Sequence, residues 1–165
     1  MSRTFLVATR NAHKLQEIQD LLVGLEIQVL SLTDAGIPMH PDEESIEVFD
    51  SFEGNALAKA RYYRGRSDLP TIADDSGLCV DALDGAPGIH SRRFAPLEFR
   101  GELDEDEANN RWLLDQLDGV PEERRGAHYR CALALADEGR TLLVNGAVHG
   151  RIATGPRGPN GFGYD

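Results

Sequence analysis

Pro70-Thr71-Ile72-Ala73-Asp74-Asp75-Ser76-Gly77 is the stretch of sequence that most directly indicates the fold. Its first half is apolar and β-branched, and it predicts a buried strand. Its second half is polar and ends in glycine, so we expect this strand to end there and a further strand to run from Leu78 to Leu83. Ligands of open α/β sheets bind outside the carboxyl ends of the strands. The segment Asp74 to Gly77 is therefore the first candidate for a functional site.

The sequence before this stretch alternates between strand and helix patterns. In some segments apolar residues recur at helical spacing. The segments between them contain short apolar runs, which are typical of buried strands. The expected elements are a strand over Met1–Ala8, a helix carrying Leu15 to Leu22, a strand at Ile27–Leu30, a mobile surface loop from Thr33 to Asp50, and a helix from about Phe52 to Arg64.

The sequence after it predicts one helix followed by paired strands. An acidic run from Asp104 to Glu107 suits a helix N-terminus, and the helix would end near Gly119. Two strand patterns, Tyr129–Ala136 and Thr141–Val148, flank a turn at 137–140. Strands and helices alternate early and strands pair late, so the sequence predicts an α/β fold with a mixed sheet. We expect residues 1–165 to form one continuous domain with an elaborated lobe.

Composition excludes several classes of function. The net charge of -11 argues against binding to nucleic acid polymers, which requires a broad basic surface. An acidic protein can still bind a small polyphosphate when a few basic residues converge and a divalent cation bridges the carboxylates to the phosphates. No apolar run has the length that crosses a bilayer, so we expect no membrane partner and a cytoplasmic protein. The histidines lack zinc-site spacing, and both cysteines lie in apolar stretches.

The segment Thr9-Arg10-Asn11-Ala12-His13-Lys14 lies where the first strand meets the first helix. Free backbone N–H groups and the helix dipole attract anions at such a junction, and Lys14 adds a positive charge. Its spacing is neither that of a P-loop nor G-x-G-x-x-G. Taken alone, the segment fits an Asn-capped helix with a surface lysine equally well.

The Asp74-Asp75 pair supplies the chemistry expected of the segment Asp74 to Gly77. Adjacent residues of a strand point to opposite sides, so we expect only one carboxylate to face a site. That carboxylate would hold Mg²⁺ and activate a water molecule, with Ser76 hydrogen-bonding a phosphate. Lys59 follows Asn55 by one helical turn, so the two share a face. An Asp-Ser-Gly turn capped by its own side chains is the alternative interpretation.

The segment from Gly158 to Asp165 places an aromatic ring and a carboxylate on a glycine-rich backbone. Glycine permits positive φ and close approach to a ligand, so this segment is typical of half of a binding site.

Considered together, these segments resemble the inosine/xanthosine triphosphate pyrophosphatase family, and the resemblance covers essentially the whole chain. The segments that carry the resemblance are Thr9–Lys14, Phe52-Glu53-Gly54-Asn55-Ala56 with Lys59-Ala60, Ala73-Asp74-Asp75-Ser76-Gly77-Leu78, Gly85-Ala86-Pro87-Gly88 and Gly161-Phe162-Gly163-Tyr164-Asp165. The resemblance implies an elongated mixed β-sheet with flanking helices, two lobes around a central cleft, and a homodimer.

The implied activity is Mg²⁺-dependent hydrolysis of non-standard purine nucleoside triphosphates (ITP, dITP and XTP) to the monophosphate and pyrophosphate. By the same resemblance, Thr9, Arg10, Asn11, Ala12, His13 and Lys14 would hold the triphosphate, supported by Lys59 and Ser76. Glu47 and Asp75 would bind the metal, with Glu53 as the alternative to Glu47, and Asp75 would be the general base. Phe162, Gly163, Tyr164 and Asp165 would contact the nucleoside, with the Phe162 ring stacked on the purine.

The sequence departs from the family after Asp165, where family members continue with residues that recognise the 6-oxo purine. We therefore expect weak or unselective activity from the 165-residue chain. Two other interpretations stay open: a nucleotide pyrophosphatase of different base specificity, for example for modified pyrimidine triphosphates, and a non-catalytic nucleotide sensor.

Overall fold

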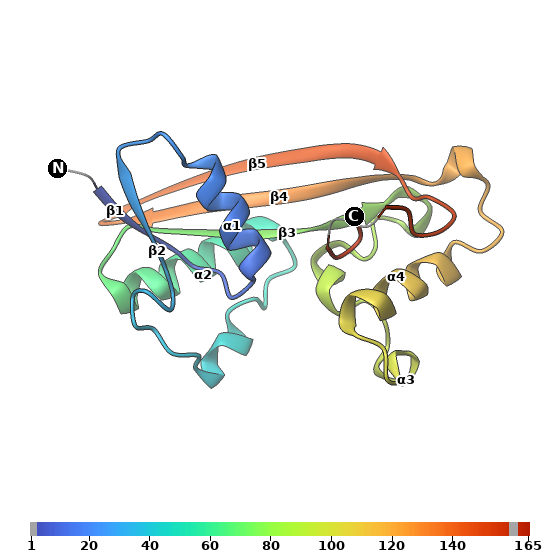
Figure 1. Ribbon diagram of the computed structural model, residues 1–165, viewed down its shortest axis with the longest axis horizontal. Coiled ribbons are helices and arrows are strands. Elements are labelled where there is room, and N and C mark those ends of the chain that lie inside the picture. The colour runs from blue at the N-terminus through green and yellow to red at the C-terminus, as the bar shows by residue number, and fades with distance from the viewer. Residues whose placement is uncertain (1–2, 159–161) are drawn as a thin grey trace. The chain divides into compact units, whose positions relative to one another are not determined.

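The structure is a computed structural model that describes residues 3–158 and 162–165 (Figure 1). Strands and helices alternate in the first half of the chain, and the last two elements are long strands. The elements are β1 (Arg3–Val7), α1 (Ala12–Leu21), β2 (Ile27–Ser31), η1 (Pro41–Ser45), α2 (Phe52–Ser67), β3 (Thr71–Val80), η2 (Asp81–Leu83), η3 (Gly88–Arg93), α3 (Leu97–Arg100), α4 (Glu105–Gln116), η4 (Glu122–Arg124), β4 (Gly126–Asp137) and β5 (Arg140–Arg151), where η marks a 3-10 helix.

The chain divides into two compact units. Unit 1 comprises Met1–Asp75 and Ala132–Asn145, and unit 2 comprises Ser76–Cys131 and Gly146–Asp165. Strand β3 contributes to both, because the division falls between Asp75 and Ser76. That the two units belong to one domain stays a prediction.

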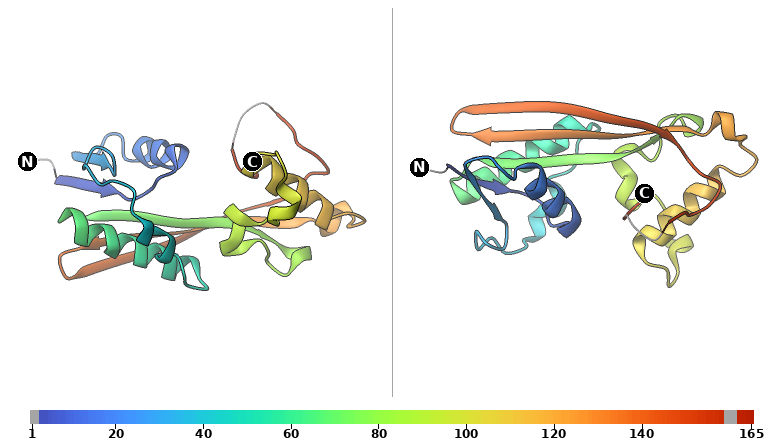
Figure 2. Two further views of the ribbon diagram at one scale, coloured as in Figure 1. Left: turned by 90° about the horizontal axis from the view of Figure 1, so that it is seen from below. Right: turned by 45° about the horizontal axis from the view of Figure 1, so that its top comes forward.

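Unit 1 is built on parallel strands. Strand β1 pairs with β2 from Arg3 opposite Ile27 to Val7 opposite Ser31, and it pairs with β3 on its other side. Crossovers between parallel strands are right-handed. The direction in which a crossover moves along the sheet therefore decides on which face of the sheet its helix lies. The crossover to β2 and the return to β3 run in opposite directions, so α1 and α2 cover opposite faces of these strands, as Figure 2 shows.

The strand order of the sheet is β2-β1-β3-β4-β5. A two-residue turn at 138–139 joins β4 to β5, so this pair is antiparallel and the sheet is mixed, which confirms the predicted fold class. Strand β5 is exposed along its whole length, including the side chains of Leu142, Val144 and Val148.

The core of unit 2 forms around α4. Asp104 caps this helix, accepting a hydrogen bond from the Glu107 N–H at 2.9 Å, as the acidic run predicts. The buried residues of the core are Leu78, Val80, Leu113, Leu117 and Ala127. Among the large apolar side chains of α4 and its C-terminal end, Leu113 and Leu117 are buried, whereas Trp112 and Leu114 are half-buried.

Strand β3 corrects one prediction, because it does not end at Asp74. The whole strand has ten residues, Thr71 to Val80, and runs through the Asp74–Gly77 segment, while Asp81–Leu83 forms a 3-10 helix in place of the expected second strand. The pattern was misleading because consecutive carboxylates disfavour a buried strand unless other elements supply partners. The flanking helices of unit 1 supply them here.

Two further differences concern the segments between the main elements. The predicted loop from Thr33 to Asp50 contains the 3-10 helix η1, and the short helix α3 was not predicted. Strand β1 covers Arg3–Val7 of the strand predicted over Met1–Ala8, whose first two residues lie outside the described residues. Cys79 is buried and Cys131 is half-buried.

One buried amide joins α4 to the segment before α3. Asn109 Oδ1 accepts hydrogen bonds from the backbone N–H groups of Phe94 and Ala95 at 3.1 and 2.8 Å, and its Nδ2 donates to the carbonyl of Arg92 at 2.9 Å. The side chain is almost completely buried, so no water replaces these bonds.

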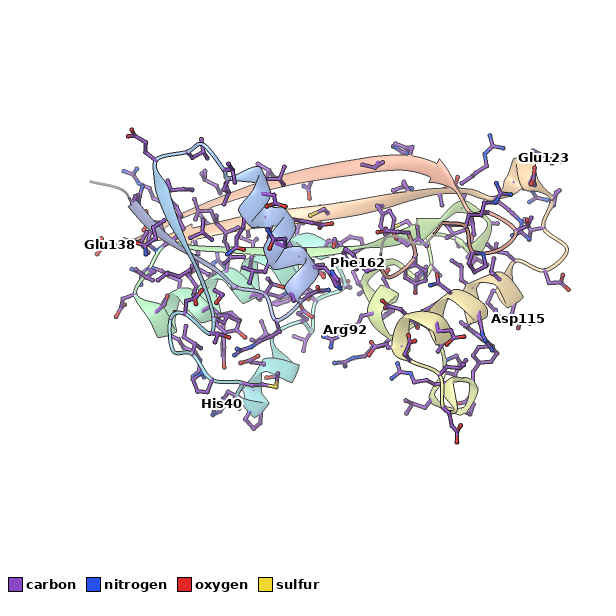
Figure 3. The ribbon with its side chains drawn as sticks, in the orientation of Figure 1. His40, Arg92, Asp115, Glu123, Glu138 and Phe162 are labelled. Carbon is purple, nitrogen blue, oxygen red and sulfur yellow. The ribbon has the colours of Figure 1, made fainter. Side chains whose placement is uncertain are left out.

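We therefore predict that Asn109→Ala lowers the free energy of unfolding by about 2 to 4 kcal/mol, because it leaves buried backbone groups without partners. Urea denaturation followed by the fluorescence of Trp112, the single tryptophan, measures this directly. Asp115→Ala on the exposed side of the same helix (Figure 3) is the control, with an expected change below about 0.5 kcal/mol. Equal effects of the two substitutions would contradict the prediction.

Candidate active site

The loop after β1 is organised by its own side chains. Thr9 Oγ1 accepts a hydrogen bond from the Asn11 N–H at 3.1 Å, and Asn11 Oδ1 accepts from the N–H groups of His13 and Lys14 at 2.9 and 3.2 Å. Asn11 is therefore the N-cap of α1. The Asn-capped helix that the sequence allowed as an alternative is therefore present. The capping hydrogen bonds hold the loop at the positive end of the helix dipole.

The two aspartates of β3 meet different helices, as the alternation of a strand requires. The Asp74 carboxylate lies 2.7 Å from Nζ of Lys14, which α1 supplies. The Asp75 carboxylate accepts a hydrogen bond from Nδ2 of Asn55, on α2, at 3.0 Å. Both aspartates are buried, with 5% and 9% of their surface exposed. A buried charge needs such partners, since an unpaired one is costly.

Lys59 of α2 brings a second ammonium group to this place. Its Nζ donates to the backbone carbonyl of Asp74 at 2.8 Å and forms an ion pair with the carboxylate of Glu47. The structure thus gathers Lys14, Lys59 and Glu47 around the Asp74-Asp75 pair. All of these residues belong to unit 1.

Burial raises the pKa of the Asp75 carboxyl above its ordinary value of 3.8. The hydrogen bond from Asn55 and the charges of Lys59 and Lys14 lower this pKa, while the charge of Glu47 raises it. Glu47 is therefore close enough for its charge to act on Asp75. A carboxylate with a raised pKa is a stronger base than a solvated one.

The segment that carries Glu47 is fastened to the start of α2. Asn55 Oδ1 accepts a hydrogen bond from the Phe49 N–H at 2.9 Å, so the same amide that binds Asp75 also holds this segment. Gly54 allows the close approach, since a Cβ there would lie 2.7 Å from Cβ of Phe49. The sequence predicted that Asn55 shares a helix face with Lys59, but it gave no sign of this double role.

The oxygen ligands at this place suit a hard divalent cation. Within residues 3–158 and 162–165, no three histidine, cysteine or carboxylate side chains gather as a complete metal site. Mg²⁺ needs only one or two protein carboxylates when substrate phosphates and water supply the rest. The mutual repulsion of Glu47 and Asp75 is the kind of interaction that a bound cation would relieve, so the residues fit Mg²⁺.

Arg10 has partners that the sequence did not reveal. Its Nε and Nη2 donate to the two carboxylate oxygens of Glu43 at 3.1 and 2.7 Å, and its Nη1 donates to the carbonyl of Ile37 at 3.1 Å. The guanidinium carbon lies 6.0 Å from the ring centroid of Tyr63. Nothing in the local pattern could have found this ion pair, because its members lie 33 positions apart.

The predicted nucleoside-contacting residues belong to unit 2, as does Ser76, which is half-buried. The Phe162 N–H donates to Oδ2 of Asp165 at 3.2 Å, and the Asp165 N–H donates to the carbonyl of Phe162 at 3.1 Å, so these residues form a closed turn. Pro159, Asn160 and Gly161 of the same predicted segment lie outside the described residues.

Helix α4 and η3 hold this turn. The Gly163 N–H donates to Oδ2 of Asp106 at 2.9 Å, and Nδ2 of Asn110 donates to the Gly163 carbonyl at 2.7 Å. The Tyr164 hydroxyl donates to the carbonyl of Ser91 at 2.7 Å, and its ring packs on the core of unit 2. Tyr164 therefore stabilises unit 2, and contact of the turn with a nucleoside stays a prediction.

The chain is similar to known proteins over nearly its whole length. The model of the Ham1 family matches residues 5–165. The dITP/XTP pyrophosphatase of Geobacter sulfurreducens is 48% identical over 161 residues, which are 97% of this chain and 76% of that protein. The dITP/XTP pyrophosphatase of Geobacillus kaustophilus is 45% identical over 164 residues, or 99% and 76% of the two chains.

Solved structures agree with these similarities. A Ham1 protein from Coxiella burnetii superimposes with a TM-score of 0.82 at 35% identity, covering 99% of this chain and 79% of that one. The dITP/XTP pyrophosphatase from Mycobacterium abscessus gives a TM-score of 0.76 at 44% identity, with 98% and 81% covered.

The raised pKa of Asp75 predicts how stability depends on pH. The folded protein holds the Asp75 proton more tightly than the unfolded chain does, so this contribution to stability is fully present below pH 3.8 and is lost as the pH rises through the raised pKa. Asp75→Asn should therefore raise the melting temperature at pH 7, with an advantage that disappears as the pH approaches 3.8.

Asp74→Asn is the matched control for this prediction. It removes the partner of the Lys14 ammonium and should lower the melting temperature at pH 7. Thermal unfolding followed by circular dichroism between pH 3.5 and 8 compares the two variants. A lower melting temperature for Asp75→Asn at pH 7 would show that burial does not dominate at this carboxyl.

Proposed function

The chain belongs to the Ham1 family, and we propose from this that it hydrolyses the non-standard purine nucleoside triphosphates ITP, dITP and XTP to the monophosphate and pyrophosphate. The observation that carries the proposal is the convergence of Lys14 and Lys59 on the buried Asp74-Asp75 pair, beside the capped start of α1. Cleavage of a phosphoanhydride requires charge neutralisation, positioning and one activated water molecule. Two of the relatives are dITP/XTP pyrophosphatases, which supports the substrate class.

In this proposal the triphosphate lies at the start of α1. The proposed donors to the phosphates are the Ala12 N–H, the Thr9 hydroxyl and the Asn11 side-chain amide, with Lys14 as a positive charge, while the His13 N–H is bonded to Asn11 Oδ1. Lys59 supports the phosphates from α2, and Ser76 is proposed as a further hydrogen-bond donor. A lysine can exchange a protein carboxylate for a phosphate oxygen because its ammonium is a rotatable point charge.

We propose Mg²⁺ as the cofactor, held by Glu47 and Asp75. Glu47 is favoured over Glu53 because the charge of Glu47 acts on the Asp75 carboxyl. When bound, Mg²⁺ neutralises phosphate charge and lowers the pKa of a coordinated water molecule. Asp75 is the proposed general base: its carboxylate takes a proton from water as the water oxygen attacks phosphorus, and the phosphoanhydride bond between the α- and β-phosphates breaks to release pyrophosphate.

The nucleoside is assigned to the turn Phe162–Asp165, with the Phe162 ring stacked on the purine. The hydrogen bonds of Gly163 to α4 support this, since they hold the turn in one conformation. We further propose a cytoplasmic homodimer without nucleic acid or membrane partners. The exposed apolar side chains of β5 support a second copy as partner, and no helix in the described part of the chain has the length and hydropathy to cross a bilayer.

Replacing the proposed base separates an enzyme from a nucleotide sensor. Asp75→Asn should lower the rate of pyrophosphate release from ITP by about 10³-fold, because it removes general-base catalysis. ITP should still bind in a calorimetric measurement, because Lys14, Lys59 and the start of α1 remain, but with a lower affinity, because one proposed Mg²⁺ ligand is lost. Asp115→Asn, a change of the same type on the exposed side of α4, is the control. Unchanged turnover in Asp75→Asn would rule out this base.

Removal of divalent cations tests the cofactor. Dialysis against EDTA should abolish pyrophosphate release, and Mg²⁺ should restore it, because hydrolysis needs the phosphate charge to be neutralised. A coupled assay for inorganic pyrophosphate follows both steps. Full activity in EDTA would contradict the metal assignment without affecting the assignment to the family.

A further inference from the structure

Arg10 lies between two proposed phosphate-binding residues, Thr9 and Asn11, yet its guanidinium group is directed to protein acceptors. Its Nε, Nη1 and Nη2 each donate a hydrogen bond, two of them to Glu43 and one to the carbonyl of Ile37. The two bonds to Glu43 form a bidentate pair, which is the strongest geometry available to these two side chains. Three of the five N–H donors of this group are therefore already used within unit 1.

Glu43 is held as firmly from its other side. Its Oε1 also accepts a hydrogen bond from the backbone N–H of His40 at 3.1 Å, which completes the capping box of η1 (His40 is labelled in Figure 3). Burial raises the pKa of Glu43, but hydrogen bonds from Arg10, Tyr63 and His40 outweigh it and leave this pKa below its ordinary value. Tyr63, on α2, is itself buried.

This network connects the parts of the proposed site. Arg10 belongs to the loop that carries Thr9 and Asn11, and Glu43 belongs to η1, four positions before Glu47. The Arg10–Glu43 ion pair therefore fastens the phosphate-binding loop to the segment that carries the proposed metal ligand. The Glu43 carboxylate has 15% of its side-chain surface exposed and the Arg10 side chain 27%, so solvent screens the pair only in part.

An arginine in a phosphate-binding segment is ordinarily a phosphate ligand. For Arg10 to act so, its guanidinium would have to leave Glu43, and a mostly buried carboxylate would lose its partner, which is costly. The carboxylate also cancels much of the positive charge that a phosphate would otherwise meet. These two observations favour a role that acts through the backbone of the loop.

We propose that Arg10 is a positioning residue, not a phosphate ligand, and that its ion pair with Glu43 sets the phosphate-binding loop against the segment of Glu47. This inference rests on the proposed function, because it concerns the same site. It assigns to Glu43 and Arg10 one shared role, whereas a phosphate ligand would act without Glu43.

The test compares Arg10→Gln, Glu43→Gln and the double variant. Glutamine at position 43 keeps an oxygen for the His40 N–H and removes the ion pair alone. A misplaced loop should lower kcat/KM for ITP by about 10- to 100-fold in each single variant and raise the Mg²⁺ concentration for half-maximal rate. The double variant should be no worse than either single variant, because both remove the same interaction.

Two controls sharpen the comparison. Arg10→Lys keeps the charge but cannot form the bidentate pair, so it should be impaired nearly as much as Arg10→Gln. Asp42→Asn removes a charge from the same 3-10 helix, where Asp42 pairs with His40 at 3.1 Å and not with Arg10, so its kinetics should match the wild type.

Three results would overturn the proposal. A KM that is unchanged or lower in Glu43→Gln but raised in Arg10→Gln would make Arg10 a phosphate ligand, as would full activity of Arg10→Lys. Lower melting temperatures with unchanged kcat, KM and Mg²⁺ requirement would make the pair a purely structural one. Calorimetric binding of tripolyphosphate with Mg²⁺ to the same variants keeps the test independent of turnover. A wild type that binds tripolyphosphate but does not cleave ITP would contradict the proposed function. In that case the affinities of the variants for tripolyphosphate still decide the role of Arg10.

Discussion

Two adjacent carboxylates buried in the middle of a strand are the constraint on which the rest of unit 1 depends. Asp74 and Asp75 face opposite sides of β3, so each must find its partner on a different helix. Lys14 reaches Asp74 from α1 and Asn55 reaches Asp75 from α2, while Lys59 binds the carbonyl of Asp74. The parallel β2-β1-β3 arrangement provides helices on both faces, and thereby makes this burial tolerable.

The same contacts that stabilise the aspartates also order the proposed site. Each ammonium group now held by a carboxylate or carbonyl is a proposed phosphate ligand, and Glu47 and Asp75 lie close enough for their charges to interact. Asn55 holds the segment that carries Glu47, and the Arg10–Glu43 pair holds the loop before α1. A preorganised site of this kind spends little free energy on rearrangement when its ligand binds.

The sequence predicted the family and the mixed sheet, because five short segments in the correct order are specific even when each one alone is not. Asn11 as a helix cap and the start of α2 were likewise predictable, since capping is local chemistry. The strand break predicted at Asp74 was wrong because local propensity cannot show partners that distant helices supply. Glu43 was missed for the same reason, because its partner, Arg10, is remote in sequence. In addition, the N-cap residue of η1, His40, is not one of the usual capping types.

Asp75 is a buried carboxyl with a raised pKa, and we propose that Mg²⁺ compensates its charge. The sharpest test is nuclear magnetic resonance titration of the Asp75 carboxyl carbon, first without divalent cations and then with Mg²⁺. We expect a pKa above the ordinary 3.8 in the metal-free protein and a marked decrease when Mg²⁺ is added. A pKa at or below 3.8 without the metal, or one that Mg²⁺ leaves unchanged, would refute this assignment.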